Sequence, residues 1–203
     1  FTENISHSYP HCWRCHKPVI FRATSQWFMN LDHNDLRKKT IEAIHQAKWI
    51  PLWGEEKIAN MVQARPDYCL SRQRIWGTPI PVFQCKKCGK EIIDIEAINK
   101  TIEKTKKEGI EFWFKENTSY LLPSNLICSS CESKEFIQEL DIVDVWFESG
   151  VSWAAVLEQN EQLTFPADIY LEATDQHRGW FQSSLLPSIA SRNKAPYKMV
   201  ITH

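Results

Sequence analysis

The chain has 203 residues, enough for one large domain or for a domain with a small appendage. Its 24 Lys and Arg residues nearly balance 25 Asp and Glu residues, for a formal net charge of -1. That balance excludes a wholly basic nucleic-acid-binding protein but leaves room for a local basic patch. With 43% hydrophobic residues, only 6 Gly and no biased tract, the chain falls outside the disordered and fibrous classes. No apolar run approaches the roughly 18 residues of a membrane helix.

The N-terminal segment is rich in serine, histidine and aromatic side chains and holds the pair Cys12-x-x-Cys15. The short apolar run 18–21 behind this pair predicts a strand. The sequence opens at Phe1 without an export signal and stops at His203, directly after another apolar run. We therefore expect a piece of a longer protein. We expect it in the cytoplasm, because paired cysteines without an export signal are typical of metal sites in reducing compartments.

Helical periodicity runs from Asn34 to Trp49, where apolar and small residues recur at three- and four-residue spacing. Asn34 is the expected N-cap of this helix and Pro51 its expected stop. A second helix is predicted over 55–64, and a strand leads into Cys85. The periodic face of the first helix consists of Leu36, Thr40, Ala43, Ile44 and Ala47.

Residues 85–140 form a separate small unit with a Cys-x-x-Cys pair at each end and a Lys/Glu-rich helix over 93–108. The two pairs, Cys85/Cys88 and Cys128/Cys131, predict a tetrahedral four-sulfur site for structural zinc, with no position left for a catalytic water. The alternative is four reduced, buried thiols. A second alternative is a zinc-ribbon RNA-binding module, although interleaved glutamates favour a solvated helix. Its candidate phosphate contacts are Lys90, Lys100, Lys104, Lys106 and Lys107.

Cys12 and Cys15 cannot close a zinc site by themselves, because such a site needs four ligands. Cys69 stands alone in a different segment. We expect Cys12 and Cys15 to form a second metal site only with a partner pair that lies upstream of this sequence.

Residues 141–203 contain a strand over 167–171, a helix over 176–192 and a strand over 197–202. A crossover of this length forces parallel pairing, so both strands end at the same sheet edge, where α/β proteins bind ligands. Glu172 and Asp175 follow the first strand, and His203 follows the second. We expect these three side chains to converge. The alternative is that they are ordinary strand-end and cap residues.

Four strings carry a resemblance to a known family: PHCWRC with FRATSQWF behind it, SRQRIWGTPIP, DVWFESG and YLEATDQHRGWFQSSL. Together they resemble the isoleucyl-tRNA synthetases, a branch of the class I aminoacyl-tRNA synthetases. The valine and leucine branches share part of the pattern and stay as alternatives. The resemblance implies an α/β fold, namely part of a Rossmann-like parallel-sheet catalytic core with an inserted zinc-ribbon-like subdomain.

The resemblance also divides the chain. Residues 1–30 correspond to the return from the inserted editing domain, and 31–84 to a helical and strand part of the catalytic core. Residues 85–140 correspond to the zinc-binding insertion, and 141–203 to a Rossmann-like βαβ part of the core.

The implied activity is activation of L-isoleucine with ATP and Mg²⁺ to isoleucyl-adenylate, followed by transfer to tRNA(Ile). The resemblance implies a monomeric parent enzyme without membrane contact. The family's His-Ile-Gly-His and Lys-Met-Ser-Lys-Ser motifs are absent from this sequence. We therefore expect no catalytic residue here and no activity from this chain alone.

Residue roles carry over by motif position. Glu172, Asp175 and Gln176 match the family's contacts to the aminoacyl-adenylate, and His203 matches a histidine near the adenine end. Trp146 and Trp180 resemble the walls of the isoleucine side-chain pocket, with plain core packing as the alternative for each. The chain departs from the family at Ala173, where glycine is usual. Arg72, Gln73 and Trp76 are at least as well explained by structural support.

Overall fold

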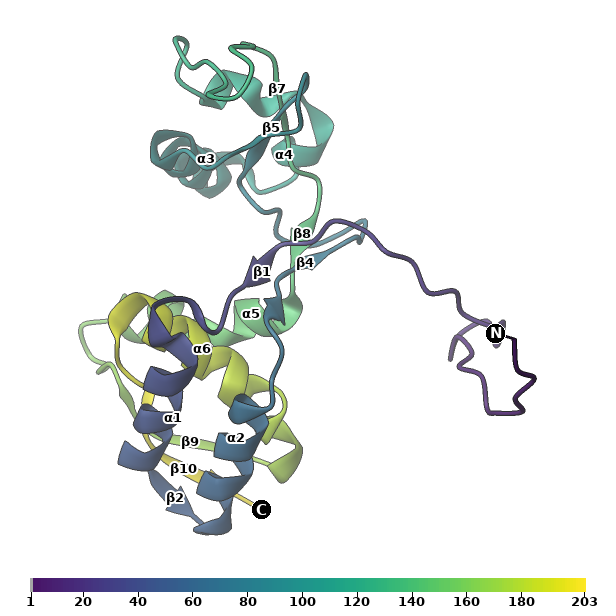
Figure 1. Cartoon of the computed structure of the whole chain (residues 1–203). Helices are drawn as coiled ribbons and strands as arrows, with labels where there is room; N and C mark the ends of the chain where they lie inside the picture. The colour runs from purple at the N-terminus through teal and green to yellow at the C-terminus, as the bar shows by residue number, and fades with distance from the viewer. Residues whose placement is uncertain (1) are drawn as a thin grey trace.

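The computed structural model describes residues 2–203. The chain forms two lobes joined by a narrow stem (Figure 1). One, which we call the sheet lobe, comprises residues 31–70 and 144–203. The other, the cysteine lobe, comprises residues 83–138. Each lobe has its own cluster of buried hydrophobic side chains, so the stem joins two separate cores.

Three parallel strands form the sheet lobe's centre, in the order β2-β10-β9. They are β2 (Lys48–Ile50), β9 (Ala167–Glu172) and β10 (Tyr197–Thr202). Val200 in the middle strand lies opposite Trp49 and Tyr170, and these three side chains are buried on one face. The predicted parallel pairing of the two C-terminal strands is confirmed, and the chain is an α/β protein with a parallel sheet.

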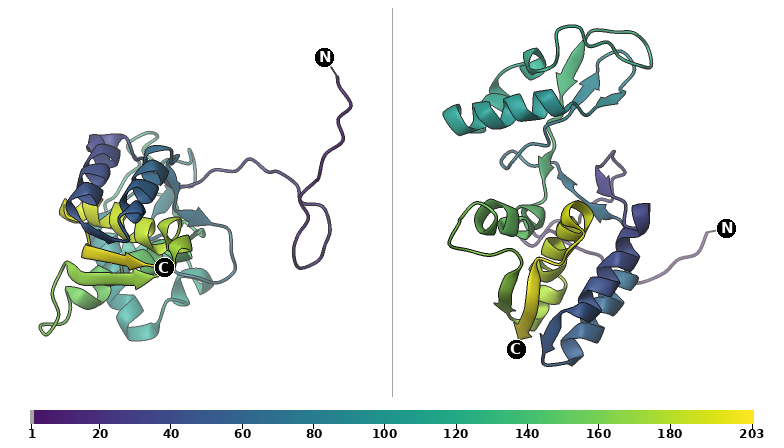
Figure 2. Two further views of the ribbon diagram at one scale, coloured as in Figure 1. Left: turned by 90° about the horizontal axis from the view of Figure 1, so that it is seen from below. Right: turned by 90° about the vertical axis from the view of Figure 1, so that its left-hand side faces the viewer.

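Helices cover that face of the sheet (Figure 2). They are α1 (Leu36–Gln46), α2 (Trp53–Gln63) and α6 (Trp180–Arg192), with α5 (Val145–Gly150) packed on α6. Short turns flank them: η1 (His33–Asp35), the π-helical η3 (Trp153–Leu157) and η4 (Thr174–His177). The opposite face is bare, since Ile50, Ile169 and Leu171 are 41%, 49% and 63% exposed.

The predicted first helix is shorter than its periodicity indicates. It begins at Leu36, after Asp35 in left-handed conformation with φ 58°, and no side chain caps it, so Asn34 is not the N-cap. It ends at Gln46, because the chain then turns to place Trp49 in strand β2. Pro51 therefore follows a strand and not a helix. The second helix is confirmed, two residues earlier than predicted.

Two further expectations need correction. The predicted strand at 18–21 is wrong, since that segment has only one isolated bridge, between His11 and Pro18, and no partner strand covers its apolar side chains. The helix expected over 176–192 is divided into η4 and α6. The break falls at Gly179, whose φ of -104° and ψ of -118° are not helical.

The cysteine lobe is an antiparallel sheet with helices beside it. Its strands are β5 (Phe83–Cys85), β6 (Glu91–Ile92) and β7 (Phe136–Gln138), in the order β6-β5-β7. Its helices are α3 (Ile95–Glu108), capped by Asp94, then α4 (Phe112–Lys115) and η2 (Thr118–Leu121). Phe83 and Trp113 fill the core between them. The predicted strand into Cys85 and the helix over 93–108 are confirmed.

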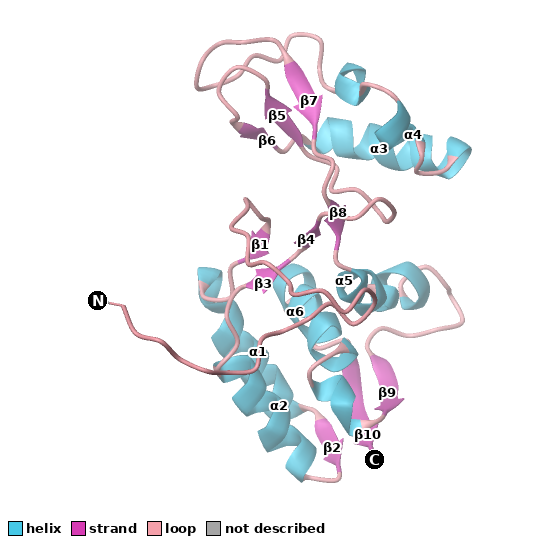
Figure 3. Ribbon diagram, turned by 90° about the vertical axis from the view of Figure 1, so that its right-hand side faces the viewer, coloured by secondary structure: helices cyan, strands magenta, loops and turns pink. Residues whose placement is uncertain are grey.

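The stem consists of two passes of the chain that pair with each other (Figure 3). Strand β4 (Ser71–Arg72) pairs antiparallel with β8 (Ile142–Val143), and β1 (Phe28–Met29) pairs with β3 (Tyr68–Cys69) beside them. The segment that precedes β1 runs away from both lobes. Across residues 2–203, no helix combines the length and the apolar character needed to span a bilayer.

Candidate adenylate edge and metal centre

The carboxyl edge of the parallel sheet gathers the polar residues that the sequence places there. Glu172 pairs in register with Thr202 on the neighbouring strand, one residue before His203. The backbone N–H of Thr174 donates a 3.0 Å hydrogen bond to the carbonyl of His203. Glu172, Asp175 and His203 all expose their side chains. Three groups suited to bind a polar ligand therefore share one open edge.

Turn η4 orients the neighbouring pair Asp175 and Gln176. The Gln176 amide donates to the Asp175 carboxylate at 3.1 Å, and its oxygen accepts the backbone N–H of Trp180 at 3.2 Å. Ala173, with φ -67° and ψ 160°, has ordinary extended backbone that needs no glycine. This backbone therefore forms without the glycine that is usual in the family.

The two tryptophans lie on different helices that are held together by small residues. A Cβ on Gly150 of α5 would come 2.1 Å from the Ser183 carbonyl oxygen, so only glycine permits this packing against α6. A Cβ on Gly179 would meet both the Gln176 oxygen at 2.6 Å and the Trp146 ring at 3.2 Å. Trp146 and Gln176 therefore lie side by side.

Trp180 is partly buried and packs against the core of the sheet lobe. Its ring stacks on Tyr170 with centroids 4.1 Å apart and planes at 6°, and its indole N–H donates to the Ser149 carbonyl at 3.1 Å. Trp146, on α5, is 45% exposed. Trp180 therefore belongs mainly to the core packing, while nearly half of the Trp146 surface is exposed.

The residues that hold this edge in place were not predicted from the sequence. Tyr170 supplies the surface against which Trp180 stacks. His177, the last residue of turn η4, is fully buried, and Lys57 of α2 reaches Thr174 at the start of the same turn. Strand alternation in 167–172 could have placed Tyr170 on the covered face, but no sequence pattern places α2 against η4.

A hollow of 220 Å³ opens beside Trp146 and Gly179. Its wall includes Asp144, which accepts a 2.7 Å hydrogen bond from the Tyr68 hydroxyl and pairs with Arg72 at 3.1 Å. Burial, more than the contact with Asp144, raises the pKa of Tyr68. The hollow is smaller than the roughly 300–1,000 Å³ of a complete ligand site. The Arg72 side chain therefore links strand β4 of the stem to Asp144, the residue that precedes α5.

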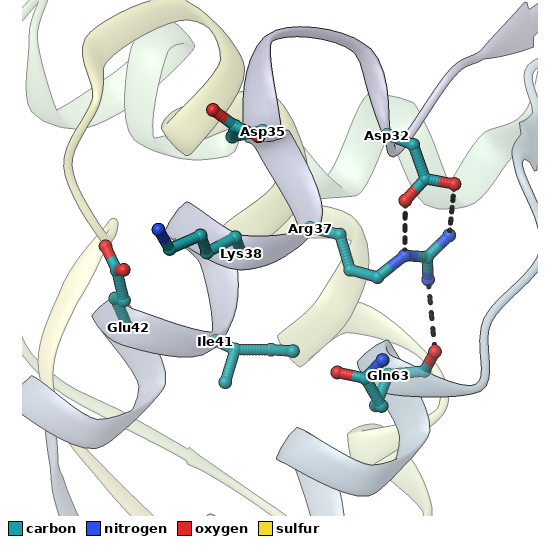
Figure 4. Close-up of a pocket in the computed structure, with 7 residues that line it drawn as sticks. All are labelled: Asp32, Asp35, Arg37, Lys38, Ile41, Glu42 and Gln63. Atoms are coloured by element: carbon teal, nitrogen blue, oxygen red, sulfur yellow. Dashed lines mark hydrogen bonds and ion pairs between the residues drawn. The ribbon is translucent and has the colours of Figure 1, made fainter.

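A surface hollow between α1 and α2 is unrelated to this edge (Figure 4). Arg37 crosses it, donating to Asp32 at 2.7 Å and to the carbonyls of Val62 and Arg65, each at 2.7 Å. The hydrogen bond from Arg37 lowers the pKa of Asp32. Because these contacts satisfy carbonyls at the end of α2, Arg37 serves the helix end.

The four cysteines of the cysteine lobe converge at one point. The Sγ atoms of Cys85 and Cys131 lie 3.5 Å apart, as do those of Cys88 and Cys128, and all four fall within 4.8 Å of one another. Four sulfurs around one zinc ion at about 2.3 Å would lie about 3.8 Å apart. The cluster therefore matches a tetrahedral zinc site in donor type and spacing.

The two cysteine pairs have the same backbone turn. The N–H of Cys85 donates to the Lys90 carbonyl, and that of Cys128 to the Ser133 carbonyl, each at 2.9 Å. The fourth residue after each leading cysteine, Gly89 or Glu132, has positive φ and donates back to it at 2.8 Å. The Ser130 N–H lowers the pKa of Cys128, whereas hydrogen bonds with the neighbouring thiols raise the pKa of Cys88.

Cys12 and Cys15 form a third copy of this turn. The N–H of Cys12 donates to the Lys17 carbonyl at 2.9 Å, and His16, with φ 56°, donates back to Cys12 at 2.8 Å. Hydrogen bonds from the backbone N–H of Cys15 and, to a lesser extent, of Arg14 lower the pKa of Cys12. Within residues 2–203, no third metal-ligating side chain joins this pair.

Ion pairs engage three of the four lysines of α3. Lys100 pairs with Glu96 at 2.6 Å, and Lys106 with Glu103 at 2.8 Å. Lys104 pairs with Glu116 at 3.0 Å. A helix that pairs most of its lysines with glutamates has the character of a solvated face, so the RNA-binding alternative is not favoured.

Comparison with known proteins agrees with the resemblance in the sequence. The family described as tRNA synthetases class I (I, L, M and V) matches residues 10–203. Isoleucine–tRNA ligase of Thermotoga maritima is 50% identical over 99% of this chain. That of Moorella thermoacetica is 53% identical over 98% of the chain. The chain spans 22% and 21%, respectively, of the length of these relatives.

One solved structure, the ternary complex of Agrobacterium radiobacter K84 agnB2 LeuRS with tRNA and LeuAMS, covers 68% of this chain at 17% identity, with a TM-score of 0.43. The assignment comes from the sequence matches, which run through both lobes and the stem. The chain belongs to the class I tRNA synthetases.

Proposed function

We propose that this chain is part of an isoleucine–tRNA ligase and contributes to the site that binds isoleucyl-adenylate. The observation that carries the proposal is about 50% identity to isoleucine–tRNA ligases over nearly the whole chain. The sheet edge supports it, because Glu172, Asp175 and His203 lie together where α/β proteins bind nucleotides. The parallel sheet supports a Rossmann-like core.

The reaction has two steps. The isoleucine carboxylate attacks the α-phosphate of ATP, which forms isoleucyl-adenylate and releases pyrophosphate. A ribose hydroxyl at the end of tRNA(Ile) then attacks the acyl carbon and releases AMP. Such displacements depend on positioning and on charge neutralisation. Mg²⁺ on the phosphates supplies part of that neutralisation when it is bound.

This chain supplies acceptors and pocket walls. The carboxylates of Glu172 and Asp175 accept hydrogen bonds from a ribose hydroxyl or from the ammonium group of the amino acid, and Gln176 can donate or accept. The rings of Trp146 and Trp180 would recognise a branched alkyl group by shape. Such walls separate isoleucine from valine by one methylene, worth about 1–3 kcal/mol.

The chain alone is proposed to be inactive. A parallel sheet is normally covered on both faces, yet Ile169 and Leu171 are exposed here. The hollow beside Trp146 is also too small for a complete ligand site. Both observations support an active site completed by further parts of a longer protein.

The cysteine lobe is proposed to bind one structural zinc ion through Cys85, Cys88, Cys128 and Cys131, within an insertion over 85–140. The shared turn geometry supports a second site at Cys12 and Cys15, with two ligands from upstream chain. We place the protein in the cytoplasm, because thiolate metal sites persist in reducing compartments.

The test is amino-acid-dependent ATP–pyrophosphate exchange by a full-length protein that carries this sequence. Isoleucine is expected to drive exchange better than valine or leucine. Asp175→Asn is expected to lower the rate at least tenfold, while Asp168→Asn, on an exposed residue of the same strand–turn unit, leaves it unchanged. Preference for valine or leucine would assign the chain to another branch, and no exchange with any amino acid would refute the proposal.

A further inference from the structure

His177 is an ionisable residue buried at the base of the candidate site. It has no exposed surface. Its ring packs near those of Trp49 and Trp53, with centroid distances of 6.0 and 5.8 Å and planes inclined at about 30°. Phe181 meets the ring edge-on at 5.4 Å. A ring enclosed in this way has one fixed orientation.

Fixed orientation directs one ring nitrogen at turn η4. Nδ1 of His177 lies 2.8 Å from the Thr174 carbonyl oxygen, and since a carbonyl only accepts, Nδ1 carries the proton and donates. Lys57 donates to the Thr174 hydroxyl at 2.7 Å and to the same carbonyl at 3.3 Å. The Thr174 N–H donates to His203. All polar groups of Thr174 are therefore engaged.

The histidine backbone is held as firmly as its ring. Gln182, itself buried, donates to the His177 carbonyl at 2.6 Å, and Arg65 donates to the Gln182 oxygen at 3.0 Å. Gly54 leaves room for the ring, because a Cβ at that position would lie 3.2 Å from His177 Nε2. Both ends of η4 are thus anchored to the core, while Asp175 between them faces solvent.

We propose that His177, assisted by Lys57, is a positioning residue that sets turn η4 so that Asp175 and Gln176 meet the adenylate. The hydrogen bond from Nδ1 of His177 to the Thr174 carbonyl fixes the turn, and the packing of the ring holds Nδ1 in place. The role rests on the proposed function, since it presumes that this turn binds isoleucyl-adenylate.

Two substitutions separate positioning from packing. His177→Phe keeps an aromatic ring beside the two tryptophans and removes the donor to Thr174. His177→Asn keeps an N–H donor at the place of Nδ1 and gives up most of the ring packing. If His177 matters only for packing, ligand affinity follows stability. If it positions the turn, affinity follows the hydrogen bond.

The experiment uses the full-length protein and isoleucyl-sulfamoyl-adenosine, a stable mimic of the adenylate. Calorimetry gives the Kd, and thermal unfolding gives the Tm of each variant. His177→Phe is expected to weaken binding about tenfold, the effect of one buried hydrogen bond, with Tm close to the wild-type value. His177→Asn is expected to lower Tm but to hold Kd within about threefold. Lys57→Met, which does not disturb the core, is expected to weaken binding about threefold.

His45→Phe is the control, because that histidine pairs with Glu55 on the surface, away from η4. It is expected to leave Kd unchanged. The positioning role is overturned if His177→Phe and Lys57→Met bind like the wild type, or if affinity follows Tm across the His177 variants. Failure of the wild-type protein itself to bind the mimic would instead refute the proposed function, and the positioning role with it.

Discussion

The two lobes differ in how much of their structure this chain provides. The cysteine lobe encloses its own core, with Trp113 and Cys128 fully buried, and it contributes all four sulfurs of its cluster. The sheet lobe buries one face under α1, α2 and α6 but leaves Ile169 and Leu171 exposed on the other. The four sulfurs of the cluster therefore come together within one lobe, whereas the sheet lobe leaves one face of its sheet uncovered.

The largest expected effect is on the folding of the cysteine lobe. Chelation or Cys128→Ser should unfold residues 83–138, because structural zinc contributes on the order of 10 kcal/mol to the folding of a small domain. Hydrogen–deuterium exchange should show loss of protection there, with little change in α6. Cys69→Ser is the matched control, since Cys69 lies outside the cluster. Full protection of β5 and β7 after chelation would show that the lobe does not need metal.

The next prediction substitutes one glycine in each lobe and compares the losses of unfolding free energy. Gly150→Ala drives a methyl group into the Ser183 carbonyl and should cost about 3 kcal/mol of unfolding free energy. Gly89→Ala, at φ 72° with nothing within 4 Å, should cost only about 1 kcal/mol. Urea unfolding of the zinc-loaded chain measures both. A larger loss for Gly89→Ala would contradict the packing described for α5 and α6.

The sheet lobe should also respond to acid through His177. Burial, reinforced by the nearby charge of Lys57, lowers the pKa of this histidine. Below about pH 6.5 the unfolded chain therefore binds a proton that the folded chain does not, and stability falls as the pH falls. Free energies of unfolding at pH 7.5 and 5.5 should differ less in His177→Phe than in the wild type or in His45→Phe. Equal pH dependence in all three proteins would rule out this contribution.

The smallest expected effect in this chain is at the bare sheet face. Leu171→Glu should change the unfolding free energy by at most about 0.5 kcal/mol, because Leu171 is already exposed. In a full-length protein the same change should cost at least about 2 kcal/mol, since the added charge would be buried. Comparison of the two unfolding curves provides the test. Equal, small costs would show that nothing covers this face.

The sequence predicted best what depends on local pattern. The β9-α6-β10 unit followed from apolar runs and a crossover length that permits only parallel pairing, and the four-cysteine cluster followed from the spacing of its pairs. Strand β2 was missed because three residues carry no periodicity, and Trp49 enters the sheet through contact with β10. The error at 18–21 has the opposite cause: an apolar run predicts a strand, but none of the described strands pairs with it.

The candidate site was predictable in its exposed residues and unpredictable in its supports. Glu172, Asp175 and His203 could be placed at one edge because strand ends in a parallel sheet coincide. The contact of Lys57 with Thr174 joins residues 117 positions apart, and no local rule connects them. The ligand roles of Glu172, Asp175, Gln176, Trp146, Trp180 and His203 stay predictions.

We propose that this chain contains all four ligands of a zinc site but only part of an adenylate-binding site. The most direct measurement takes zinc content and isoleucine-dependent ATP–pyrophosphate exchange together, on this chain and on a full-length protein that carries it. We expect zinc bound through the four cysteines in both proteins, and exchange by the full-length protein alone. Exchange by this chain by itself, or a cysteine lobe folded without zinc, would contradict it.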